Sequence, residues 1–208
     1  MKLVQKMLVC AAAGILVLAS SCTLPDPRFK PVTAPRQSHL GVSVEAPGVD
    51  GWQIHEERGA DKWFVLFKTT DPANSMRTQY VALRAARFTP SEKEQFERDI
   101  GLQKFAEGML KNSWASTDKR FRELGSEIVP ETVRDMKSVR GAMVWEEHNN
   151  PHFPGTVLRM DNSYYFFLHP VNSQVMLAVH ASTREPSDDI RLSAQSLAKT
   201  FIDSMSFN

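Results

Sequence analysis

The chain has 208 residues, 42% of them hydrophobic, with 25 basic and 24 acidic side chains. This length is enough for one domain with a sizeable core and too short for two domains of that kind. The near-neutral charge, with no basic cluster, argues against nucleic acid as the main partner.

The first residues have the pattern of a targeting segment. Lys2 and Lys6 give a positive start, and residues 7–19 are apolar up to Ser20 and Ser21. A membrane-spanning helix needs about 20 apolar residues, so this run is too short to remain in a bilayer. The pattern predicts a secretory signal peptide over residues 1–21 that is cleaved from the mature chain.

The residues before the expected cleavage site carry a family resemblance. Residues 19–22, ASSC, resemble the lipobox of bacterial lipoproteins, in which a peptidase cleaves before a cysteine whose sulfur carries a diacylglycerol. The family favours Leu three places before the cysteine, whereas here Leu18 lies four places before it. The resemblance implies a lipid on Cys22. Because Asp after the cysteine retains many of these proteins in the inner membrane, Thr23 implies the outer membrane, facing the periplasm of a bacterial envelope.

The cysteine count agrees with lipidation. Cys10 lies in the discarded segment, so the mature chain keeps Cys22 alone and cannot form an internal disulfide. Acylation removes what would otherwise be an unpaired thiol in an oxidising compartment. The alternative is an ordinary signal peptide cleaved near Ser21, which leaves a soluble protein with a free thiol.

Residues 22–40 are interpreted as the lipidated cysteine and a tether. Pro25, Pro27, Pro31 and Pro35 remove backbone donors and favour extended conformations. At about 3.1 Å per residue, such a segment would hold the domain roughly 50 Å from the membrane. The alternative is that these residues pack along the surface of a domain that spans residues 41–208.

Short strands are expected first in that domain, over residues 41–46, 52–57, 62–69 and 78–88, with turn residues between the first three of them. Apolar side chains occur at both odd and even positions of residues 62–69, which predicts a central strand covered on both faces.

A helix over residues 90–113 follows, because Thr89, Pro90 and Glu92 form a capping-box start. Five further strands are expected, with Asp161-Asn162-Ser163 as a hairpin loop between two of them. A terminal helix should begin near Ser187, with Asp188 and Asp189 at the positive end of its dipole.

This order of elements predicts an α+β fold, a largely antiparallel sheet with helices on its faces. Together with the terminal FIDSMSF, it resembles the PsbP-like domain over roughly residues 41–207. The resemblance implies an α/β/α sandwich and assigns no site residue.

Residues 146–155, EEHNNPHFPG, are the stretch whose side chains most suggest a functional site. His148 and His152, with Glu146 or Glu147, could approach a metal, and His169 or His180 would have to complete the ligand set. Pro151 prevents a regular helix, so the spacing does not place both histidines on one face. We therefore prefer a polar turn and expect no metal and no other cofactor.

Arg84 and Arg87 interrupt an otherwise apolar strand. They are expected to pair with acids at the sheet edge, and the alternative is an anion-binding groove floored by Arg84. His180 alternates with apolar residues and is expected to be hydrogen-bonded in or beside the core.

The sequence favours a membrane-anchored envelope lipoprotein that acts as a binding or assembly accessory and not as an enzyme. Its expected partners are the membrane, through Cys22, and an envelope protein. The alternatives are a metal-dependent envelope enzyme that uses the 146–152 loop and a small-ligand carrier.

Overall fold

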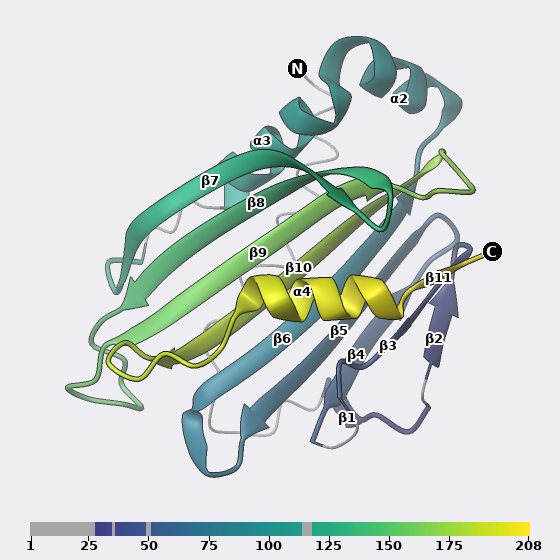
Figure 1. The fold of residues 1–208 in the computed structure, drawn as a ribbon. Helices are drawn as coiled ribbons and strands as arrows, with labels where there is room; N and C mark the ends of the chain where they lie inside the picture. Colours follow the sequence, from purple (N-terminus) through teal and green to yellow (C-terminus); the bar gives the residue numbers. More distant parts are fainter. Residues whose placement is uncertain (1–27, 35, 49–50, 114–117) are drawn as a thin grey trace.

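The computed structural model describes residues 28–34, 36–48, 51–113 and 118–208, and within them the strands form two antiparallel sheets (Figure 1). The expected signal peptide and the expected lipidation site Cys22 lie outside these residues. The small sheet has the order β11 (Ser206–Phe207), β3 (Val42–Glu45) and β2 (Arg36–His39). The large sheet has the order β1 (Lys30–Pro31), β4 (Gln53–Arg58), β5 (Lys62–Asp71), β6 (Asn74–Arg87), β10 (Val175–Pro186), β9 (Leu158–Leu168), β8 (Met136–Glu147) and β7 (Phe121–Val133).

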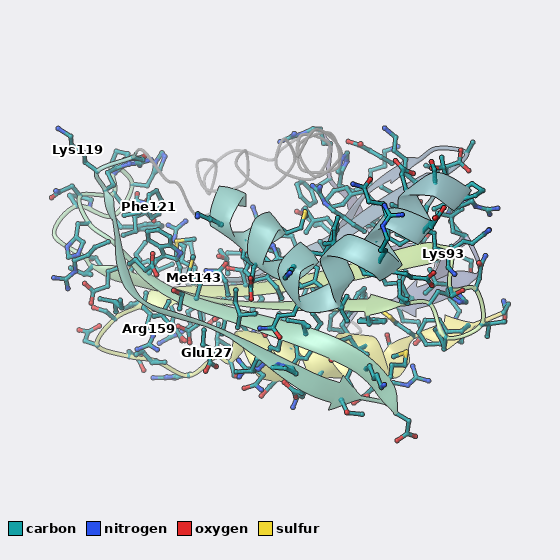
Figure 2. All side chains as sticks on the ribbon, turned by 90° about the horizontal axis from the view of Figure 1, so that it is seen from above. Lys93, Lys119, Phe121, Glu127, Met143 and Arg159 are labelled. Carbon is teal, nitrogen blue, oxygen red and sulfur yellow. The ribbon has the colours of Figure 1, made fainter. Side chains whose placement is uncertain are left out.

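The helices lie on opposite faces of the large sheet, as Figure 2 shows from above. Helix α4 (Ala194–Ser204) and the small sheet cover one face, which we name the α4 face. Helix α2 (Pro90–Gln95), the π-helical turn η1 (Phe96–Ile100) and α3 (Gly101–Ser113) lie on the other, the α3 face. The expected α+β fold with an antiparallel sheet is confirmed, although strands make up most of the described domain.

The main core lies on the α4 face. Alternate residues of the central strands point there, and Phe201 of α4 packs edge-on against Phe67 with ring centroids 5.9 Å apart. The strand residues of this core are Trp63, Val65 and Phe67 of β5, Val81, Leu83 and Ala85 of β6, Tyr165 and Phe167 of β9, and Val175, Leu177, Val179 and Ala181 of β10.

The second core is smaller and lies where α3 packs on β7, β8 and β9. Phe96, Phe105 and Leu110 bring the apolar side of the helical segment onto Phe166 and Val139. Among the described residues, this core includes no side chain of β4 or β5. The expectation that β5 is covered on both faces is therefore wrong in part, because Phe64 and Lys68 remain partly exposed on the α3 face.

The expected helix over residues 90–113 begins as predicted. The side chain of Thr89 accepts from the backbone N–H of Glu92, and the Glu92 carboxylate accepts from the backbone N–H of Thr89. The helix is not uniform, however, since it widens into η1 and restarts at Gly101, whose φ of +62° favours glycine.

The expected hairpin loop at Asp161-Asn162-Ser163 is wrong. These residues lie inside β9, which pairs along its whole length with β10. Asn162 and Ser163 are buried, and Asn162 donates to the backbone carbonyl of Met143. The turn-forming residue types were misleading because tertiary hydrogen bonds of the Asn162 side chain, to Met143 and His180, hold this residue within the sheet.

The terminal helix begins later than predicted, at the N-cap Ser193 and not near Ser187. The expected role of the acids at the helix start is also wrong, because Asp189 pairs with Arg77 and Arg191. Glu185, which is buried, accepts from the backbone N–H groups of Arg191 and Leu192 and fixes the loop before α4.

Part of the segment that was expected to be a tether also contributes to the fold. Lys30 and Pro31 pair with Ile54 and Gln53 of β4, and residues 36–39 form β2. The described domain thus starts before residue 41, and residues 30–31 and 36–39 belong to the sheets.

The turn between β7 and β8 secures the end of α4. Arg134 and Asp135 adopt positive φ angles, and the Arg134 guanidinium donates to the carbonyls of Ile202 at 2.9 Å and Met205 at 2.6 Å. These carbonyls lie at the helix C-terminus, where a cation is also favoured by the helix dipole.

Arg134→Ala should lower the free energy of unfolding by about 2 kcal/mol, because it removes two charge-assisted hydrogen bonds while keeping a Cβ at the strained position. Urea denaturation measures the change. Arg98→Ala, at an exposed position on η1, is the control and should cost less than about 0.5 kcal/mol. Equal stability of the two variants would contradict this role for Arg134.

Candidate functional site

The histidines considered as metal ligands do not converge. His148 follows the end of β8, where Nε2 lies 3.1 Å from the Glu146 carboxylate, and His152 is exposed in the loop beyond it. His169 follows the opposite end of β9, whose residues 158–168 separate it from this loop by roughly 30 Å. No group of three potential metal ligands is present in the part of the chain that the structure describes.

His169 instead joins the end of the chain to the fold. Its Nε2 lies 2.9 Å from the Gly41 carbonyl, and its Nδ1 accepts from the backbone N–H groups of Val171 and Asn172. The ring also contacts Phe207 of β11 edge-on, with centroids 5.1 Å apart. The contacts of His169 therefore help to position β11 against β3.

The two carboxylates of the 146–147 pair lie on opposite faces, as alternation along a strand requires. Glu146 is partly exposed, and the Arg122 guanidinium lowers the pKa of its carboxyl below the usual range, with a smaller contribution from His148. Glu147 is completely buried. The pair cannot act together in one site.

Glu147 forms a buried ion cluster that the sequence did not reveal. Its Oε1 accepts from Asn150 at 2.9 Å and lies 3.6 Å from Arg120, while Oε2 lies 3.6 Å from Nε of Arg184. Arg184 is buried and its guanidinium also stacks over the Phe153 ring, at 5.4 Å. The cluster joins the 148–157 loop to β10, so the polar turn predicted there has an ordered, structural base.

Glu147→Gln should destabilise the protein by about 3 kcal/mol, because buried Arg184 would lose the carboxylate beside its Nε, while Arg120 would keep its pairing with Asp118. Thermal or urea unfolding measures the loss. Glu123→Gln, at an exposed position on β7, is a matched control that should change little. A negligible difference between the two variants would mean that the cluster does not support the loop.

The part of the α3 face formed by β4, β5 and β6 stays partly accessible, and we name it the open half-face. The sheet register identifies its side chains. Phe64 pairs with Arg84, and Arg84 pairs with Ala178, which packs against the smaller core, so these residues share the α3 face. Leu66 and Ala82 form a buried floor. The surrounding partly or fully exposed side chains are Gln53, His55, Glu57, Lys62, Phe64, Lys68, Thr70, Thr78, Tyr80, Arg84 and Ala86.

Aromatic rings and cations alternate across this surface. His55 lies 6.0 Å from the rings of both Phe29 and Phe64. Nζ of Lys68 lies 5.7 Å from the Phe29 ring, and the Arg84 guanidinium lies 5.1 Å from the Phe64 ring. These cation–π contacts orient the Lys68 ammonium and the Arg84 guanidinium against the two aromatic rings.

Arg84 and Arg87, considered together from the sequence, have separate surroundings. Arg87 pairs with an acid as predicted, Asp61 at 3.7 Å, but at the end of a central strand and not at the sheet edge. Arg84 points to the opposite face and belongs to the open half-face, where stacking on Phe64 was not predicted. The hypothesis that Arg84 lines an anion-binding surface remains a prediction.

His180 lies beside the open half-face in a polar cluster. Its Nε2 is 3.2 Å from both the Asn162 side-chain oxygen and the Tyr80 hydroxyl. The ring stacks on Tyr164 with centroids 4.0 Å apart. This arrangement agrees with the prediction of a hydrogen-bonded histidine in or beside the core.

Burial fixes the charge state of this cluster. Desolvation, with a smaller contribution from Arg84, lowers the pKa of His180 to about 3, and desolvation raises the pKa of Tyr80 and Tyr164 above their usual value. All three groups are therefore neutral near pH 7. They can donate and accept hydrogen bonds, but His180 is a poor proton-transfer group at that pH.

Acid should destabilise the protein through His180. The unfolded state takes up a proton at the usual pKa of 6.5 and the folded state only near 3, so the free energy of unfolding falls by about 1.4 kcal/mol per pH unit below 6.5. Urea titrations at pH 7.0 and 5.5 would show this slope. His180→Gln should remove it and exposed His152→Gln should not; an unchanged slope in His180→Gln would contradict the burial of a neutral imidazole.

No family model matches the chain, and no curated protein matches it. Among solved structures, it is similar to the solution structure of cyanobacterial PsbP (CyanoP) from Synechocystis sp. PCC 6803. The sequence identity is 14% and the TM-score 0.44, over 92% of this chain and 99% of that chain. A likeness of this degree does not establish a family. The fold assignment rests on the strand order and the two covered faces.

Proposed function

We propose that the protein is a lipid-anchored accessory module of the bacterial envelope, which binds at the membrane surface and carries out no catalysis. The observation that carries this proposal is the open half-face, an ordered aromatic and cationic surface next to the point where the N-terminal segment joins the sheet. The neutral state of the nearby His180 favours binding over acid–base chemistry.

The N-terminal segment supports an arrangement close to the membrane. Six residues separate Cys22 from Phe29, whose ring contacts His55 and Lys68 on the open half-face. An extended chain of that length spans at most about 25 Å. A lipid on Cys22 would thus keep the domain near the bilayer instead of presenting it at long reach. None of the helices in the described part of the chain has the length and hydropathy to span a bilayer.

The anchoring step is tested by mass spectrometry of the mature N-terminus, which should begin at Cys22 and carry the mass of a diacylglycerol and a further acyl chain. The wild-type protein should fractionate with outer membranes, and Cys22→Ser should be released from them, because two or more acyl chains are needed for stable anchoring. Cleavage at another bond, or an unmodified thiol, would disprove the lipid anchor.

The accessory role requires a protein partner in the envelope. Chemical crosslinking of membranes that contain the lipidated protein should enrich the same envelope component repeatedly. A tethered control protein, with the same first 29 residues on an unrelated domain, separates this partner from proteins that are merely close to the anchor. Enrichment no greater than that of the control would contradict the accessory role.

A further inference from the structure

We propose that the open half-face lies against the membrane and binds the headgroups of anionic lipids. The proposed orientation of the domain, with this surface toward the bilayer, rests on the proposed lipid anchor at Cys22. The contact itself depends on the folded surface and can be tested without the lipid.

The first argument is the local charge. The open half-face carries Lys62, Lys68 and Arg84, against the single carboxylate of Glu57, whose Oε1 lies 3.2 Å from His55. Residues 1–21 contain Lys2 and Lys6 and no acid, so the mature chain as a whole has 23 basic and 24 acidic residues. Positive charge is therefore concentrated on this surface and is not a property of the whole protein. Cations close to an anionic membrane surface are each attracted appreciably.

The second argument is where the chain leaves the domain. The Phe29 ring contacts His55 and Lys68, so the segment that leads to Cys22 begins on the α3 face at the β1 edge of the sheet. The open half-face adjoins this edge, whereas α3 packs on β7, β8 and β9 toward the other side. A short anchored segment brings this surface, before any other part of the sheet, to the bilayer.

The third argument is the chemistry of the side chains. Phe29 and Phe64 are partly exposed, and Lys68 and Arg84 lie over their rings. Aromatic groups that lie beside cations match the headgroup region of a membrane, where apolar carbon and phosphate occur at similar depth. An acidic protein segment would satisfy the charges, but only a membrane also accounts for the position of the surface next to the anchored segment.

Binding is tested with the mature chain carrying Cys22→Ser, which has no lipid and, without Cys10, no other thiol. Its sedimentation with vesicles of phosphatidylcholine alone is compared with vesicles that also contain 30% phosphatidylglycerol. We expect binding that increases with phosphatidylglycerol and is lost in 1 M salt, where the screening length falls to about 3 Å.

The variants locate the contact. Lys62→Ala with Lys68→Ala should weaken binding to the anionic vesicles roughly 30-fold, which corresponds to about 1 kcal/mol per cation at about 1.4 kcal/mol per factor of ten. Lys119→Ala with Lys137→Ala removes two exposed cations near the β7–β8 edge, where Figure 2 labels Lys119, and should change binding less than twofold.

A probe reports the orientation. An environment-sensitive dye on Thr70→Cys, an exposed position of the open half-face, should shift to the blue on anionic vesicles, and the same dye on Thr132→Cys of β7 should not. Absence of phosphatidylglycerol-dependent binding, equal loss in the two lysine pairs, or equal shifts at the two dyes would each overturn the inference. Lipidation of Cys22 could still be correct in that case, because its mass-spectrometric test is independent.

Discussion

The structure depends on burial of the α4 face of the large sheet. Alternate residues of β5, β6, β9 and β10 pack there against α4 and the small sheet. Because side chains of a strand alternate strictly between faces, this single constraint fixes the register of the central strands. Polar contacts then fix the position of α4, with Glu185 before its start and Arg134 at its end.

One face of the large sheet, the α4 face, is buried in the main core. The other face, the α3 face, has a covered part and an accessible part. The helical segment of α2, η1 and α3 covers the part formed by β7, β8 and β9, while the side chains of β4, β5 and β6 stay partly accessible. Fully buried strands show apolar residues on both faces, whereas here lysine, arginine and histidine occupy one face of β5, β6 and β4. This division leaves the open half-face accessible, and the proposed membrane contact uses it.

The buried polar groups have structural roles that also limit the chemistry. His180 is neutral and hydrogen-bonded to Asn162, and Glu147 is held by Asn150 between two arginines. Groups fixed in this way contribute to a unique fold and have little freedom to transfer protons or bind a metal. The 148–157 loop contains two of the histidines considered as metal ligands. It is held in place by the carboxylate of Glu147, which precedes it.

The sequence by itself determined the elements whose signals are local. The capping box at Thr89, the strand at residues 62–69 and the antiparallel pairing of strands follow from hydrogen-bond patterns and periodicities within a few residues. The tertiary structure alone decided that Asn162 lies inside a strand, that α4 starts at Ser193, that residues 30–39 join the sheets, and that Arg84 stacks on Phe64. Each of these depends on partners distant in sequence, and the energy of a buried hydrogen bond or ion contact overrides the local preference of the residue that makes it.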